Sequence, residues 1–449
     1  MPKRPEAGRS YNGALLEVRD LDVHFSLRGS FFDRLVGREA GSVKAVDGVS
    51  FDLRKGEVLG VVGESGSGKT TLGRAILHLV EPTAGSVSFE GREVSGLGQG
   101  DTRRLRRRMQ IVFQDPHASL NPAMDLETAI GHPLVIHGVT TDKDEIRKRV
   151  ARALERVGLT PPEQYLTKYP SDLSGGQKQR AVLARAVILG PDLLVADEPV
   201  SMLDMSVRAK ILELMLELKR DLDLTYLYIT HDLATAKFFC DRIAIMYLGK
   251  IVEIGPSKAI YADPKHPYTE SLLKAIPEPD PLKTVPRDLP RGGVPDAVNP
   301  PLGCSFHPRC PRAFEVCGWE ARDLRDILEE RWAHMDSGRY EPEREVIGDL
   351  DALDVVATSV DVPAGSGHRG KDIVALFDRM RSEDPDEPLW KGVREVAAGD
   401  GHATVHFHEP VDPRLLPEGD VEVSCHLHDE EARARAEEYA RSGPAAVSP

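Results

Sequence analysis

A glycine-rich stretch near residue 65 constrains the fold of this chain more than any other feature. It follows an apolar run at 58–62 and opens a helical pattern at 71–77. A strand, a glycine-rich turn and a helix in this order form a phosphate-binding loop, where backbone N–H groups and the helix dipole face the phosphates. The loop residues are Gly63, Glu64, Ser65, Gly66, Ser67, Gly68, Lys69, Thr70 and Thr71. Lys69 can reach the β- and γ-phosphates and Thr70 can ligate Mg²⁺, so we predict binding of a nucleoside triphosphate rather than a chance glycine turn.

Apolar runs that alternate with helical patterns predict one α/β domain over residues 14–262, after a polar lead-in at 1–13. A stretch of low periodicity at 27–42 interrupts it. The strand-like stretches are 15–25, 43–53, 86–89, 92–94, 109–113, 192–196 and 224–229. The helical patterns are 122–170, 181–189 and 206–222.

Three of these strands end in polar residues, which line the ligand crevice of a parallel sheet. Gln114 follows the strand at 109–113, Asp197 and Glu198 follow the strand at 192–196, and His231 follows the strand at 224–229. Asp197 suits the magnesium shell, and Glu198 suits a general base that polarises the attacking water. An acidic surface loop is the alternative for this pair. His231 either contacts the γ-phosphate or caps the next helix.

Two further segments have competing interpretations. A Ser-Gly-Gly turn at 174–176 opens a helix and offers unpaired amides to a second anion, or is a plain helix cap. The basic run at 103–108 favours a solvated helical face over a nucleic-acid or lipid patch. A net charge of −14 argues against nucleic-acid binding. No apolar run reaches the roughly 18 residues of a membrane span, and the N-terminus lacks the apolar segment of a signal peptide.

Taken in order, these motifs resemble the nucleotide-binding subunits of ATP-binding cassette (ABC) transporters. Residues 63–71 resemble the Walker A motif, 173–177 the signature, 193–198 Walker B and 201–204 the D-loop. Gln114 matches the Q-loop and His231 the switch histidine. The resemblance implies a P-loop NTPase with a RecA-like core, an antiparallel β subdomain and a helical signature subdomain. It also implies magnesium ligation by Thr70, Gln114 and Asp197.

The same resemblance implies a head-to-tail dimer with ATP at the subunit interface. In such a dimer the Walker A loop of one subunit faces the signature of the other. The residues expected to contact ATP beyond the Walker A loop are Phe25, which would stack on adenine, Ser174, Gly175, Gly176, Gln177 and Asp204. Glu198, His231 and Gln114 are the expected catalytic residues.

A narrower resemblance is to the ATPases of oligopeptide and dipeptide importers. It is carried by residues 44–51, 113–122 and 266–269, the last reading His-Pro-Tyr-Thr. It implies a peripheral ATPase on the cytoplasmic face of the cell membrane. The implied partners are a second ATPase subunit, identical or homologous, two integral membrane permease subunits and an extracellular solute-binding protein. An importer for another solute, such as an oligosaccharide or nickel, and a soluble non-transport ABC ATPase are the alternatives.

Beyond residue 262 we expect a small C-terminal extension at 263–319, an acidic insertion at 320–420, and a closing strand with a charged tail at 421–449. Within the insertion, a hairpin is predicted at 393–408, turning at 399–401. Its His402, His406 and His408 suggest either metal binding or simple alternation on an exposed strand. Alternation is the preferred interpretation.

The extension contains most of the cysteines. Cys304, Cys310 and Cys317 lie close together, and Cys425 lies in the closing strand. Thiols at this density in reducing cytosol suit metal better than a disulfide, and their spacing is not the paired pattern of a zinc ribbon. The resemblance implies a [4Fe-4S] cluster on these four residues; structural zinc and free cysteines are the alternatives. Cys240, in an apolar stretch, is expected to be a buried core residue.

Overall fold

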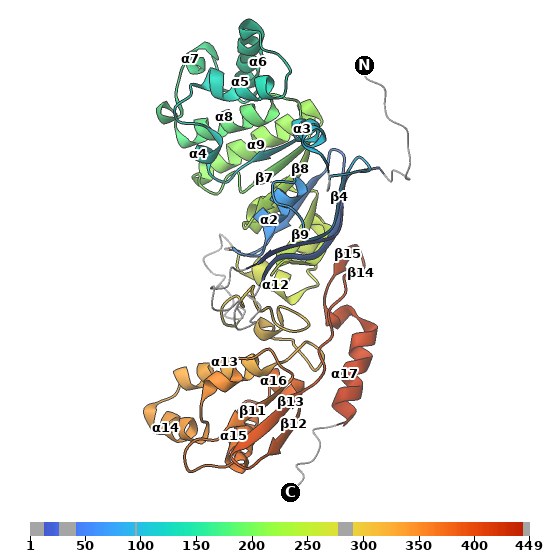
Figure 1. Cartoon of the computed structure of the whole chain (residues 1–449), viewed down its shortest axis with the longest axis vertical. Coiled ribbons are helices and arrows are strands. Elements are labelled where there is room, and N and C mark those ends of the chain that lie inside the picture. The colour runs from blue at the N-terminus through green and yellow to red at the C-terminus, as the bar shows by residue number, and fades with distance from the viewer. Residues whose placement is uncertain (1–12, 27–41, 95–96, 277–290, 443–449) are drawn as a thin grey trace. The chain divides into compact units, whose positions relative to one another are not determined.

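The computed structural model describes residues 13–26, 42–94, 97–276 and 291–442. They fall into two compact units, Met1–Ala262 and Asp263–Pro449 (Figure 1). The predicted lead-in at 1–13, except for Gly13, lies outside the described residues, as do nearly all of 27–42 and part of the proline-rich segment after residue 276. Among the described residues, no helix combines the length and apolarity needed to cross a bilayer.

The first unit is built on a mostly parallel sheet whose strands end at one edge. Parallel pairs join β9 to β3, β3 to β8, β8 to β7 and β7 to β6, and β10 adds antiparallel to β9. The strands are β10 (Lys250–Pro256), β9 (Arg242–Tyr247), β3 (Val58–Val62), β8 (Thr225–Thr230), β7 (Leu193–Asp197) and β6 (Met109–Val112). Strands β3, β7 and β8 are buried throughout, which explains their continuous apolar sequence.

An antiparallel sheet forms the second layer of this unit. Its order is β2 (Ser42–Arg54), β1 (Ala14–Ser26), β4 (Ala84–Phe89) and β5 (Arg92–Glu93). The predicted hairpin at 86–94 is confirmed, with Glu90 and Gly91 both at positive φ in its turn. The basic run belongs to helix α3 (Gln99–Arg108), as predicted.

Helices complete the first unit. A helical group carries the signature turn and is formed by α5 (Leu126–Ile136), α6 (Lys143–Arg156), α7 (Glu163–Leu166) and α8 (Gly175–Val187) (Figure 1). The remaining helices accompany the parallel strands and are α2 (Lys69–Ile76), α4 (Pro116–Ser119), α9 (Met205–Leu222), α10 (Leu233–Phe239) and α11 (Ser257–Ala262). The predicted parallel core, antiparallel β subdomain and helical signature subdomain are confirmed.

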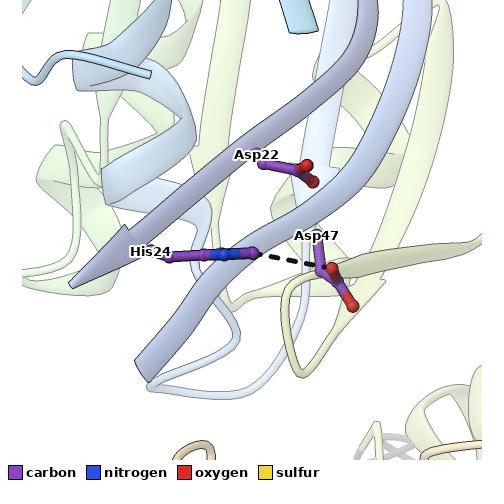
Figure 2. Close-up of side chains that lie close together, drawn as sticks. All are labelled: Asp22, His24 and Asp47. Atoms are coloured by element: carbon purple, nitrogen blue, oxygen red, sulfur yellow. Dashed lines mark ion pairs between the residues drawn. The ribbon is translucent and has the colours of Figure 1, made fainter. Parts of the chain in front are cut away.

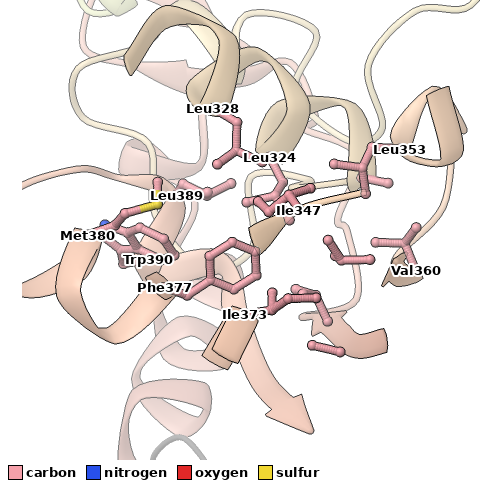
Figure 3. Close-up of a cluster of buried hydrophobic side chains, with 14 of the residues drawn as sticks. Leu324, Leu328, Ile347, Leu353, Val360, Ile373, Phe377, Met380, Leu389 and Trp390 are labelled. Atoms are coloured by element: carbon pink, nitrogen blue, oxygen red, sulfur yellow. The ribbon is translucent and has the colours of Figure 1, made fainter. Parts of the chain in front are cut away.

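The second unit begins with α12 (Pro267–Lys274) and contains an α+β core. A three-stranded antiparallel sheet has the order β11 (Ser359–Pro363), β13 (His402–Phe407) and β12 (Val393–Ala398). Its helices are α13 (Ala321–Ala333), α14 (Ser337–Val346), α15 (Gly370–Glu383) and α16 (Leu389–Gly392). Figure 3 shows the side chains of this core, including Leu328, Ile373 and Phe377.

This core extends across the residues that precede α13. Ala313, Cys317 and Trp319 are buried in the same cluster as Leu324 and Phe377. The segment that carries the three clustered cysteines is therefore fixed by packing against the acidic region that follows it. The unit closes with the hairpin β14 (Leu416–Glu418) and β15 (Val421–Val423) and with α17 (Glu430–Ser442).

The histidine-bearing hairpin forms as β12 and β13, turning at 399–401 as predicted. His402 and His406 are partly exposed and alternate with buried residues along β13. Their partners are Asp361, 3.8 Å from His402 Nε2, and Ser359, whose Oγ is 2.9 Å from His406 Nδ1. The prediction of exposure is wrong for His408, which lies just beyond the strand, is buried, and stacks on Tyr439 at 4.3 Å between ring centroids.

Candidate functional site

The glycine-rich loop connects β3 to α2, and its backbone needs glycine at particular positions. Gly66 and Gly68 have φ values of 83° and 99°, in the left-handed region that favours glycine. A Cβ at Gly68 would lie 1.9 Å from Ala45 O, and one at Gly63 would lie 2.1 Å from Met246 O. Side chains are thus excluded at both positions, where the loop approaches the backbone of Ala45 and Met246 closely.

Lys69 begins α2 and fills the hollow of this loop. Its Nζ donates hydrogen bonds to Gly63 O at 2.8 Å, Glu64 O at 2.7 Å and Ser67 Oγ at 3.2 Å. Burial lowers the pKa of the Lys69 amine, against the opposing effect of the Glu198, Asp197 and Glu64 carboxylates. The ammonium is therefore positioned by the loop itself, ready to contact an anion bound there.

Thr70 and Asp197 meet where α2 begins and β7 ends. The Thr70 hydroxyl donates to Asp197 Oδ1 at 3.0 Å. Asp197 is buried, and burial raises the pKa of its carboxyl group. Two oxygen ligands predicted for Mg²⁺ are thus within contact of one another, beside Lys69. Oxygen ligands of this kind match the preference of Mg²⁺.

Glu198 lies at the centre of a second contact group, which joins the ends of three neighbouring strands. Gln114 Nε2 donates to Glu198 Oε2 at 3.0 Å, and His231 Nδ1 lies 3.1 Å from Glu198 Oε1. Glu198 has a φ of 48°, unusual for a residue with a side chain, and its N–H donates to Ile229 O at 2.9 Å. Strained backbone of this kind clusters at functional sites. Glu198 is therefore in direct contact with the two other predicted catalytic residues.

The signature turn has a different environment. Ser174 caps α8 in a capping box with Gln177: the Gln177 N–H donates to Ser174 Oγ, and the Ser174 N–H to Gln177 Oε1. A Cβ at Gly176 would lie 2.8 Å from Val207, and one at Gly175 3.6 Å from Leu203. Within the described residues, no hydrogen bond or ion pair joins 174–177 to the loop at 63–71. The part of the chain that the structure describes thus shows no polar contact between these two predicted anion sites.

Arg208 is a site residue that the sequence reasoning missed. Its Nε donates to Leu203 O at 2.9 Å, and its Nη2 donates to Ser201 O at 3.2 Å. Its Nη1 lies 3.7 Å from Asp232 Oδ2, directly after His231. The guanidinium thus ties the segment after Glu198 to the segment after His231. Its place in the first turn of α9, four residues after the capping Asp204, was the available signal.

Phe25 is the second-last residue of β1 and lies next to a small cluster of charged side chains. The Phe25 side chain, which is predicted to stack on adenine, is exposed. Figure 2 shows neighbouring Asp22, His24 and Asp47, with His24 Nε2 3.6 Å from Asp47 Oδ1. Among the described residues, only these three bring His, Cys or carboxylate ligand atoms within 4.8 Å of one another as a group of three or more. Lys250 lies 3.5 Å from Asp47 and supplies a positive charge to the cluster.

A second candidate site, in the second unit, is a small cavity that brings the four predicted cysteines together. Cys304, Cys317 and Cys425 are buried and Cys310 is partly buried. The whole lining is His266, Pro267, Cys304, Phe306, His307, Cys310, Arg312, Phe314, Cys317, Cys425, His426 and Leu427. Cys425 thus reaches the other three although the α+β core separates them in sequence. Cys240 lies elsewhere, buried in the first unit as predicted.

Comparison with known proteins gives matches in both units. Residues 46–201 match the family described as ABC transporter, and residues 252–317 match the oligopeptide/dipeptide transporter C-terminal region. A Brucella ovis protein named as a peptide import ATP-binding protein is 47% identical over 70% of this chain and 94% of its own length. The oligopeptide transport ATP-binding protein AppF of Bacillus subtilis is 45% identical over 68% of this chain and 91% of its own. The structure of cbiO1 from Clostridium perfringens aligns over 56% of this chain and 92% of its own, at 28% identity and a TM-score of 0.48.

Proposed function

The chain belongs to the ATP-hydrolysing subunits of ABC transporters, in the oligopeptide/dipeptide group, and from that membership we propose that it drives peptide import across the cytoplasmic membrane. The contact of Glu198 with both Gln114 and His231, beside the loop that holds Lys69, is the observation that carries the ATPase assignment. The chain would act as a peripheral protein on the cytoplasmic face, with Mg²⁺ and ATP.

The proposed chemistry assigns one task to each side chain. Lys69 and the loop amides would hold the β- and γ-phosphates, and Thr70, Asp197 and Gln114 would hold Mg²⁺. The bound Mg²⁺ would neutralise charge on the phosphates. Glu198 accepts a proton from the attacking water, and His231 orients that water and the γ-phosphate.

We also infer that two ATPase subunits share each site. Ser174 and the following amides open α8, and such amides bind anions at helix starts. Among the described residues, the polar contacts of this turn stay within it, and we propose that the phosphates it would contact are held by the loop of a partner subunit. Gly175, Gly176, Gln177 and Asp204 would join Ser174 at that interface, and Phe25 would stack on the adenine.

A surface cavity of about 670 Å³ on the first unit is the proposed contact site for the permease subunits. Arg103 and Arg106 from α3 line it together with Ile136 and His137 at the end of α5. Ile136 and the adjacent Val135 are both exposed apolar residues. Two arginines beside an exposed isoleucine fit a permease helix that carries acidic and apolar side chains.

Reconstitution tests the transport role and this surface together. With permeases and a solute-binding protein in liposomes, we expect ATP-dependent peptide uptake. Ile136→Glu is expected to abolish co-purification with the permeases while ATP binding persists, because it buries an acid among apolar contacts. Val294→Glu, at an exposed apolar position of the second unit, is the matched control. Uptake of nickel or an oligosaccharide without peptide would favour the alternative solutes.

The cysteine cavity is proposed to hold a [4Fe-4S] cluster. Four thiolates are the usual shell of such a cluster. The four sulfurs line one cavity, and structural zinc on the same thiolates is the alternative. Burial raises the pKa of Cys310 to about 12, so metal binding would release protons.

Metal analysis after anaerobic purification tests this proposal. We expect about four iron and four sulfide per chain, as in a single [4Fe-4S] cluster. Cys310→Ser should lose most of the iron, because it removes one thiolate. Cys240→Ser is the control, since Cys240 lies buried in the first unit. Stoichiometric zinc without iron would contradict the cluster.

A further inference from the structure

The cysteine cavity contains a donor atom besides its four sulfurs. His426 follows Cys425, begins the short helix η4 (His426–His428), and is only 1% exposed. Its Nε2 is buried and has no hydrogen-bond partner. A buried polar atom without a hydrogen-bond partner destabilises the fold, so it calls for an explanation.

The surroundings of the His426 ring suit a metal-binding imidazole. The ring packs edge-on against Phe314, another residue of the cavity lining, at 6.3 Å between ring centroids. A neutral imidazole carries one lone pair, and a ring nitrogen that no protein group engages can present it to a metal.

The two other histidines of the cavity lining have their ring nitrogens engaged differently. His307 lies between Cys304 O, 2.8 Å from Nδ1, and Asp323 Oδ2, 2.9 Å from Nε2. His266 uses Nδ1 to accept a hydrogen bond from the Tyr268 N–H at 3.0 Å, so its lone pair is already occupied. His426 is thus the one histidine of this lining with a lone pair available to metal.

We propose that His426 is a reserve nitrogen ligand of the cysteine cavity, which takes the fourth ligand position when the Cys425 thiol is lost. The two residues are adjacent, and both line the cavity. Four thiols and one imidazole nitrogen exceed by one the four ligands that such a cluster needs. This inference rests on the proposed cluster, and it adds a residue outside the four-thiol set.

The test compares Cys425→Ser with and without His426. We expect Cys425→Ser to retain at least about half of its iron, with a strong ¹⁴N coupling in pulsed EPR of the reduced protein and a raised reduction potential, as nitrogen-for-sulfur ligation produces. Cys425→Ser/His426→Leu should lose the iron. His426→Leu alone should keep it, since all four thiols remain. Cys425→Ser/His428→Leu is the matched control, because His428 lies on the same turn but outside the cavity lining.

Two results would overturn the reserve role. One is loss of iron from Cys425→Ser to the level of the double variant with His426→Leu. The other is retention of iron without nitrogen coupling. If the wild-type protein holds no iron and sulfide, the cluster proposal fails by itself. The same variants loaded with Co²⁺ alone then decide His426, through the presence or absence of a nitrogen-dependent shift in the Co²⁺ absorption bands of Cys425→Ser.

Discussion

Replacing Glu198 by Gln is expected to lower ATP hydrolysis by at least about 10²-fold, because a positioned general base contributes about 10²–10⁴-fold. The amide keeps the size of the carboxylate but cannot accept a proton from water. Gln114 and His231 contact Glu198 at 3.0 and 3.1 Å, so the substituted side chain should stay in place. Phosphate release under saturating Mg-ATP measures the loss, and equilibrium binding should be nearly unchanged.

Two further measurements make this prediction specific to Glu198. Glu217→Gln alters an exposed carboxylate on α9 and should leave turnover unchanged. In Glu198→Gln, ATP should stay bound and hold subunits together, so gel filtration with ATP should show a dimer. Turnover near the wild-type rate in Glu198→Gln would remove Glu198 from the role of base.

Lys69→Ala is expected to weaken nucleotide binding, the step that precedes hydrolysis. Hydrogen bonds to charged groups contribute about 1.5–3 kcal/mol each, so losing the ammonium should weaken ATP binding by at least about tenfold. The change also leaves Gly63 O and Glu64 O without the amine that now bonds both. Titration with Mg-ATP by calorimetry measures the affinity. Lys210→Ala, at an exposed position of α9, is the control, and unchanged affinity in Lys69→Ala would reject its phosphate contact.

Lys69→Ala, used together with Ser174→Arg, tests whether two subunits share each ATP site. Ser174→Arg should block hydrolysis while isolated subunits still bind ATP, because it adds bulk and charge at the partner-facing turn. Mixing Ser174→Arg with Lys69→Ala subunits restores at most one intact site in each mixed dimer. Full activity from a dilute, monomeric preparation would contradict shared sites.

The sequence was sufficient to predict most of the nucleotide site. The loop at 63–71, its lysine and its flanking strand and helix are adjacent in the chain, so local rules describe them. Gln114, Asp197, Glu198 and His231 each follow a buried apolar strand, and the ends of parallel strands share one edge. Their meeting follows from sheet topology, which the alternation of strands and helices predicts.

The sequence did not predict the contacts of Arg208, the burial of His408 or the ring orientation of His426. The Arg208 contacts join two loops that follow different strands, and nothing in a helical pattern specifies such a partner. His408 was predicted to be exposed from alternation, yet it is buried under Tyr439 of α17. The unpaired Nε2 of His426 depends on how its ring is turned, and a residue type carries no such orientation.

The cysteines show the division between sequence and structure most clearly. Their number and spacing identify a metal-binding candidate, but three of them lie before an α+β core and the fourth lies after it. Cys317 and Trp319 pack into the same core as α13 and α15, and that packing fixes the segment that carries the three clustered cysteines. The sequence by itself determined the donor atoms. Only the tertiary structure decided that they line one cavity, because the packing that gathers them joins residues far apart in the chain.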